Sequence, residues 1–211
     1  MSEITLEKKY VLEYIKDILN DVKLNGVNIG EAKYHHNTSY SNAPLICQYG
    51  ILSLQDIKNH KINDYTDECL KMMSDTDSHI NGSDSVSLSV VGLDDLYPDE
   101  DEYNPHKPNE VDFRVSSGIK AYRSTLHYGN EYLSKSIGID KLRAIDIYLL
   151  ELISKELNNI DKIIEKYNNL IKICISMKQT NLDIPLREIS FDTNYALDID
   201  KLSKCQKVKL K

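Results

Sequence analysis

Hydrophobic positions recur every three or four residues near both ends of the chain. Near the N-terminus they run over residues 5–22, and near the C-terminus they run from Ile153 to Met177. This spacing places apolar side chains on one face of an α-helix. We therefore predict an N-terminal amphipathic helix within residues 1–27. A helical C-terminal extension is predicted within residues 151–211, where it would cap the core or mediate a homodimer.

Residues 28–150 carry the alternation and turn signals that are typical of strands. Val86, Leu88 and Val90 alternate with three serines, which predicts a half-buried strand. A loop is predicted where three of the five prolines and a cluster of acidic residues fall together. This loop covers residues 94–110, and further strand-like stretches lie at residues 32–36, 111–115, 128–133 and 144–147. The tail from Ile184 onward is predicted to form short extended pieces without a clear period. Together with the terminal helices, this pattern predicts an α+β fold.

The segment from Ser39 to Gly50 has the features of a short helix. Its leading residues, Ser-Tyr-Ser-Asn, offer an N-cap, Pro44 falls in the first turn, and a glycine follows the last turn. Leu45, Ile46 and Tyr49 would form its apolar side. A helix is therefore expected directly after the first strand.

Composition and charge exclude several classes of protein. With 211 residues and 41% hydrophobic residues, one domain, or one domain with a helical appendage, is expected. The net charge of −7 argues against broad nucleic-acid binding, which relies on lysine and arginine. No run approaches the ~20 apolar residues of a membrane span. The charged N-terminus lacks the apolar core of a signal peptide, so we expect a cytoplasmic protein.

The cysteines do not form a recognisable pattern. There is no Cys-x-x-Cys pair and no metal-ligand spacing, so we interpret them as free thiols and expect no metal site. The four are Cys47, Cys69, Cys174 and Cys205.

One segment carries a specific motif, His36-x-Thr38-x-x-x-Asn42-x-x-x-Ile46-x-x-x-Gly50. An isolated histidine most often satisfies a turn, but five matched positions favour a nucleotide site. The motif resembles that of the histidine-motif, DarT-like ADP-ribosyltransferases, where a strand carries His-x-Thr and the next helix carries Asn, Ile and Gly. This resemblance implies an ADP-ribosyltransferase-like core with a split, strongly curved sheet, and NAD as the substrate. It assigns NAD binding to His36, with Thr38 and Asn42 holding the strand-to-helix turn.

The resemblance implies two further landmarks. A strand with small hydroxyl residues is matched by Ser85–Ser89, where Ser87 would shape the nicotinamide-ribose pocket, although an ordinary strand with outward serines is an alternative. A glutamate before a late strand is matched by Glu131, which the resemblance implies is catalytic. A carboxylate there would stabilise the positive charge that develops on the anomeric carbon as nicotinamide leaves. Glu188 is the second candidate for this role.

An arginine usually completes such sites, because a guanidinium binds the diphosphate in a bidentate manner. Arg123, shortly before the candidate glutamate, is assigned to this role, with Arg114 and Arg187 as alternatives. DarT-like enzymes carry an arginine earlier, after the second strand, but residues 91–110 contain none. The position of the arginine is therefore a departure from the family.

The resemblance predicts an NAD-dependent ADP-ribosyltransferase that modifies a macromolecule, as bacterial or phage toxins, effectors and counter-defence proteins do. The acidic charge favours a protein over a nucleic-acid acceptor. Tyr122, Tyr128 and Tyr132 are expected to stack on nicotinamide or on an acceptor base. One alternative is NAD hydrolysis with water as the acceptor. The other is a non-enzymatic module on the same fold that sequesters a nucleotide or a protein, which the missing early arginine favours.

Overall fold

The computed structural model describes residues 29, 31–67, 69–71, 73–74, 84–90, 111–124, 131–147, 159–190, 193–197 and 199–204. Four expectations lie outside these residues. They are the N-terminal helix, the loop at 94–110, Tyr128 and the first part of the predicted C-terminal helix.

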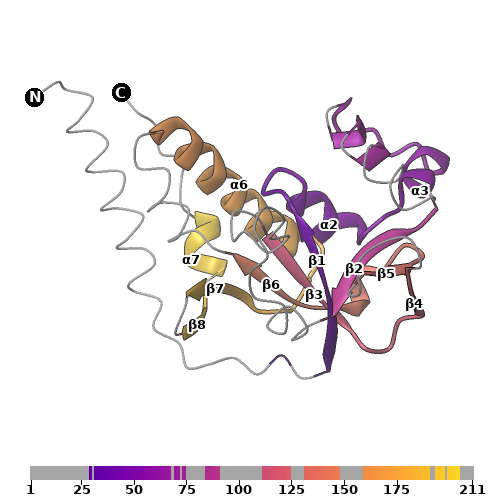
Figure 1. Ribbon diagram of the computed structural model, residues 1–211. Helices are drawn as coiled ribbons and strands as arrows, with labels where there is room; N and C mark the ends of the chain where they lie inside the picture. The colour runs from indigo at the N-terminus through magenta and orange to yellow at the C-terminus, as the bar shows by residue number, and fades with distance from the viewer. Residues whose placement is uncertain are drawn as a thin grey trace, which may run out of the picture.

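A single mixed sheet organises the described chain (Figure 1), in the order β4-β5-β2-β1-β3-β6-β7-β8. Every pair of neighbouring strands is antiparallel except β6 and β7, which are parallel. The strands are β1 Ala32–Thr38, β2 Val86–Val90, β3 Val111–Ser116, β4 Ala121–Arg123, β5 Glu131–Ser134, β6 Leu142–Ile147, β7 Leu186–Ser190 and β8 Thr193–Ala196. The mixed α+β class is thus confirmed.

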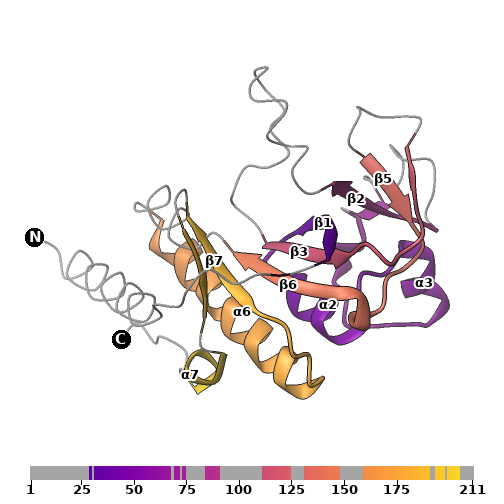
Figure 2. The same ribbon diagram turned by 90° about the horizontal axis from the view of Figure 1, so that it is seen from below.

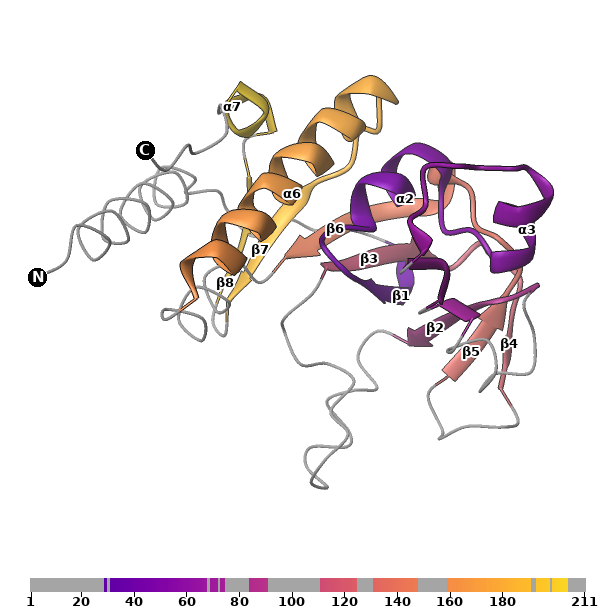
Figure 3. The same cartoon turned by 90° about the horizontal axis from the view of Figure 1, so that it is seen from above.

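Two helices, α2 (Ala43–Tyr49) and α6 (Ile160–Gln179), pack on the same side of this sheet (Figure 3). The long helix α6 connects β6 to β7, and a crossover of this kind is what a parallel pair of strands requires. The shorter elements are α3 Leu54–Asn59, the 3₁₀ turn η2 Ile139–Lys141 and α7 Ile199–Lys204.

The two faces of the sheet differ in polarity. One register row joins His36, Phe113, Ile145 and Leu186, and the last three belong to the buried cluster that also contains α2 and α6 residues. We call this side the helix face. The adjacent row lies on the opposite side, which we call the reverse face, and it joins Asn37, Asp112, Asp146 and Arg187. The helix face is therefore mainly apolar along this row, and polar side chains gather on the reverse face.

The sheet splits between β1 and β2. These strands are paired at two positions among the described residues, Tyr34 with Val90 and His35 with Ser89, whereas β1 pairs with β3 at six. Beyond His35 the first strand continues along β3, and β2 continues along β5. Figure 2 shows β5 turned steeply away from the direction of β3 and β6. The split leaves a gap in the ladder beside His36.

The C-terminal part is more than the helical extension that we predicted. It contains α6 and α7, but β7 and β8 also extend the sheet, and the buried cluster is continuous across both parts of the chain. Residues 121–123 form strand β4, where we predicted no strand. No helix in the described part of the chain is both long enough and apolar enough to cross a membrane.

Candidate functional site

Hydrogen bonds connect three of the predicted residues, His36, Ser87 and Glu131. They lie on β1, β2 and β5, which are neighbours in the sheet. The His36 Nδ1 atom lies 2.9 Å from the carbonyl oxygen of Ser87. The Ser87 hydroxyl donates to Oε1 of Glu131 at 2.7 Å. Ser87 therefore binds the imidazole through its backbone carbonyl and the carboxylate through its hydroxyl, although the three residues are far apart in the sequence.

This constellation lies at the split in the sheet. His36 shares the helix face with Phe113, its partner on β3. Glu131 pairs with Ser89, which also pairs with His35, so the Glu131 and Ser87 side chains belong to the reverse face. The His36 ring reaches the edge of β2 because the ladder has ended at this level. The imidazole thus lies at the gap on the helix face, and the carboxylate lies at the gap on the reverse face.

The protonation state of His36 follows from its surroundings. Burial lowers the pKa of His36 below its ordinary value of 6.5, and this outweighs the hydrogen bond to Ser87 and the charge of Asp112, which raise it. The ring is therefore neutral at pH 7. Because the Ser87 carbonyl can only accept, Nδ1 carries the proton and Nε2 is an acceptor. A hydroxyl group of a ligand is a matching donor for Nε2.

The two oxygens of the Glu131 carboxylate have different surroundings. Oε1 accepts from Ser87, whereas Oε2 is buried without a hydrogen-bond partner. A buried carboxylate oxygen without a donor is costly, and a donor placed beside it is stabilising. The site therefore offers two acceptors to a ligand, Nε2 of His36 and Oε2 of Glu131.

Thr38 and Asn42 hold the turn between β1 and α2, as we expected. The Asn42 amide donates to the Thr38 hydroxyl at 3.0 Å, and its oxygen lies 3.5 Å from the Cys69 thiol. Asn42 occupies the N-cap position of α2, but its side chain does not cap the helix. The Ser39 hydroxyl accepts from the Asn42 N–H at 3.2 Å instead. Both residues brace the segment that follows His36.

The last two motif positions attach α2 to the strand that carries the glutamate. Ile46 is buried in the core. Gly50 has a φ of 86°, and a Cβ at this position would lie 2.2 Å from the Ile137 carbonyl oxygen. Ile51 and Ile137 exchange two backbone hydrogen bonds, of 2.9 and 2.8 Å. Glycine is thus required where α2 ends against the segment that follows β5.

Tyr122 and Arg123 lie on β4, at the edge of the sheet. The Tyr122 ring is 56% exposed, and its hydroxyl lies 3.3 Å from the Ser85 hydroxyl. Arg123 pairs with Tyr132, so it lies on the opposite face of the sheet from Glu131. The structure therefore places Tyr122 on the reverse face with Glu131, and Arg123 on the helix face, to which His36 belongs.

The alternative arginines and the alternative glutamate lie elsewhere in the sheet. Arg114 Nε donates to Asp146 at 2.6 Å, and Arg187 donates to the same carboxylate at 2.7 and 2.8 Å. Glu188 is buried on β7, on the helix face. Strand β7 is three strands from β1, about 14 Å at the usual strand spacing. Of the two candidate glutamates, Glu131 is the one that contacts Ser87.

Sequence analysis missed the polar cluster on the reverse face. His35 belongs to this face, and its Nδ1 lies 3.4 Å from Asp112 Oδ1. The Asn37 amide donates to the same oxygen at 3.2 Å. Asp112 and Asp146 are both buried. The alternation Val-Asp-Phe-Arg-Val indicated the strand, but it carries no information on whether the polar positions are covered.

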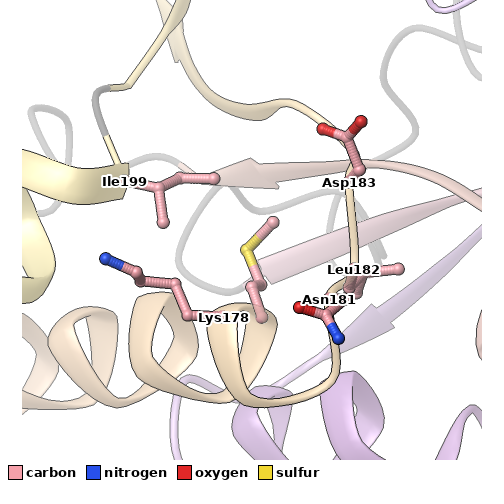
Figure 4. A pocket seen from close by; sticks show the side chains of 6 residues that line it. Lys178, Asn181, Leu182, Asp183 and Ile199 are labelled. Atoms are coloured by element: carbon pink, nitrogen blue, oxygen red, sulfur yellow. The ribbon is translucent and has the colours of Figure 1, made fainter.

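A surface pocket of about 310 Å³ lies between the C-terminal end of α6 and the start of α7 (Figure 4). None of the predicted site residues lines it; its lining is Met177, Lys178, Asn181, Leu182, Asp183 and Ile199. In the described part of the chain, no group of three or more metal-ligating side chains comes together. Cys47, Cys69 and Cys174 form no disulfide bond in the described part of the chain, and Cys205 lies outside it.

Comparisons with known proteins return no match: the chain matches no protein-family model, no curated protein and no solved structure.

Proposed function

We propose that this protein is an NAD-dependent ADP-ribosyltransferase whose site is formed by His36, Ser87 and Glu131. The observation that carries the proposal is the pair of hydrogen bonds that meets at Ser87. The resemblance assigned these three residues from three separate stretches of sequence. His36 and Ser87 are 51 positions apart in the sequence, and Ser87 and Glu131 are 44 positions apart. Local sequence effects therefore do not explain why the three residues lie together at the split in the sheet.

The acceptors at this site suit the hydroxyl groups of NAD. Nε2 of neutral His36 would accept from one ribose hydroxyl. Oε2 of Glu131 would accept from the 2′-hydroxyl of the nicotinamide ribose, and so satisfy the buried oxygen. Backbone groups of β1 beyond His35, where β2 no longer pairs, are available to the nicotinamide amide. The chain therefore supplies acceptors for the sugars and backbone groups for the leaving base.

In the proposed reaction, the bond between ribose C1′ and the nicotinamide nitrogen breaks. Its electron pair remains with nicotinamide, which leaves as the neutral base. Positive charge develops at C1′, and the Glu131 carboxylate, fixed by Ser87, stabilises it. A nucleophilic oxygen or nitrogen of the acceptor then bonds to C1′ and loses its proton. Protein remains the favoured acceptor because the chain is acidic.

One observation favours the alternative of a non-enzymatic nucleotide-binding module. A diphosphate clamp requires an arginine, but Arg114 and Arg187 both bind Asp146, and Arg123 lies on the edge strand β4, with β5 and β2 between it and β1. A protein with this site would bind NAD without releasing nicotinamide. The two functions therefore differ in turnover and not in the location of the ligand.

Labelled NAD separates these functions. The full chain is incubated with labelled NAD, alone and with bacterial lysate, and both nicotinamide release and label on macromolecules are measured. We expect Glu131→Gln to reduce release by about 100-fold or more, since loss of one transition-state contact has an effect of this size. Glu165→Gln, at an exposed position on α6, is the matched control and should retain full activity.

Each outcome identifies one function. Release without label on any macromolecule indicates NAD hydrolysis. Binding of NAD that His36→Ala weakens, with no release, indicates the binding module. Full release by Glu131→Gln would contradict the catalytic assignment, and absence of both binding and release would reject an NAD site.

A further inference from the structure

Asp112 contacts both neighbours of His36 from the reverse face. Its Oδ1 atom accepts from the Asn37 amide at 3.2 Å and from His35 Nδ1 at 3.4 Å. Asp112 lies on β3 opposite Asn37, and its side chain is buried. One carboxylate oxygen thus fixes the side chains of His35 and Asn37, the residues on either side of His36.

The two contacts of Asp112 span the level at which β1 loses its pairing with β2. Up to His35 the strand is held between β2 and β3, but from His36 onward its paired neighbour is β3. An unpaired edge permits the strand to rotate about its own axis, and such a rotation would move the His36 ring. The contacts of Asp112 resist it, because they hold alternate side chains of β1 against β3.

Asp112 is itself held as an anion. Burial raises its pKa, but the hydrogen bond from His35, the charges of His35 and Arg114, and the hydrogen bond from Asn37 outweigh burial and lower the pKa overall. Further along the reverse face, Asp146 binds Arg114 and Arg187. Asp112 therefore belongs to a row of charged side chains on the reverse face that extends to Arg187 on β7.

We propose that Asp112 is a positioning residue for this site: through its contacts with His35 and Asn37 it fixes the orientation of the His36 ring. Asp112 does not contact the ligand. The inference rests on the proposed function for its ligand, but its structural content, a fixed His36 ring, is independent of any ligand.

The ring is observed directly by ¹⁵N NMR of the histidine side chains in the full chain at pH 7.5. In the parent protein we expect His36 to show a single tautomer with the proton on Nδ1. In Asp112→Ala we expect the two ring nitrogens to report a mixture of tautomers. Ser116→Ala, which removes a buried polar group from the same strand, is the matched control and should leave the His36 signals unchanged. Asp112→Asn keeps the volume of the side chain and replaces Asp112→Ala if that variant does not fold.

Titration with NAD provides the second readout. We expect Asp112→Ala to weaken NAD binding by about tenfold, in line with the loss of hydrogen bonds to a charged group, and Asp112→Asn by less. In a His36→Ala background the same change should have little further effect, because Asp112 acts through β1 at this site. A residue that only stabilises the fold would lower the melting temperature and leave NAD affinity unchanged in both backgrounds.

The two proposals fail in different ways. If the parent protein does not bind NAD, the proposed function is wrong, and the NMR comparison still decides whether Asp112 orients His36. If the parent binds NAD, but Asp112→Ala and Asp112→Asn leave the His36 tautomer unaltered, the positioning role is wrong. Equal weakening of NAD binding by Asp112→Ala with and without His36 would also overturn it.

Discussion

The two sides of β1 illustrate how one strand serves both the core and the site. Toward β3 the strand pairs at six positions, with one irregularity between Ala32 and Tyr34, and the β3 side chains on the helix face, Val111, Phe113 and Val115, are fully buried. Toward β2 the ladder stops after His35, and the next contact is made by the His36 ring with the Ser87 carbonyl. Continuous pairing satisfies every backbone group of a strand internally, whereas a split exposes some of them to a ligand. Pairing with β3 thus holds β1 rigid, while the unpaired backbone toward β2 is left to bind a ligand.

Weakening the continuous side is expected to have the largest effect on stability. Phe113 is fully buried beside His36 in the register, so Phe113→Ala leaves a cavity in the centre of the sheet. We expect a loss of about 3–5 kcal/mol in the free energy of unfolding, measured by urea denaturation. Phe113→Leu, which retains most of the volume, should lose much less. Equal losses for both variants would indicate that the position is not close-packed.

The contact between α2 and the segment after β5 should have the second-largest effect on stability. Gly50→Ala places a side chain at a φ of 86° and against the Ile137 carbonyl, so we expect a loss of about 2–3 kcal/mol. Gly118→Ala is the matched control, because its Cβ would meet only the Ser116 hydroxyl at 3.5 Å. Thermal unfolding of the two variants measures the difference. Similar melting temperatures would show that the motif glycine is not needed for the conformation.

The turn that follows His36 should contribute less. Thr38→Val keeps the shape of the side chain and removes the acceptor of the Asn42 amide. We expect a loss of about 1 kcal/mol in the free energy of unfolding. Ser41→Ala, at an exposed position of the same turn, should have almost no effect. If Thr38→Val is as stable as the parent, the brace is dispensable.

The smallest expected effect is the pH dependence that His36 contributes. Its pKa is lowered in the folded chain, so the unfolded chain takes up a proton more readily once the pH falls below about 6.5. The contribution is fully favourable above this pH and is lost as the pH falls toward the lowered pKa. Urea denaturation between pH 8 and pH 5.5 should show a steeper loss of stability for the parent than for His36→Gln. Parallel curves would mean that His36 does not titrate differently on folding.

Periodicity predicted the elements of the sheet better than their partners. The alternation of Val86 to Val90 gave the bounds of β2 correctly, and the short helix before Gly50 is observed as α2. Strand β4 was missed because three residues are too few to show a period. The tail after Ile184 has no clear period either, and its first strand forms because β6 provides an edge to pair with, while the second pairs with the first.

The site was accessible to sequence reasoning only through the motif. Its spacing placed His36, and the matched stretches placed Ser87 and Glu131, but no local pattern could show that Ser87 contacts both of the others. The row from Asn37 to Arg187 was not predicted, because its members come from four strands that are distant in the sequence. Alternation distinguishes the two faces of a strand but not whether the polar face is covered.

The position of NAD tests the central claim most directly. A crystal structure of Glu131→Gln with NAD should show the nicotinamide ribose at the split between β1 and β2, with a hydroxyl about 3 Å from Gln at position 131 and another from His36 Nε2. This result would place the ligand on the open side of β1. NAD bound elsewhere, for example at the pocket beside α7, would contradict the account.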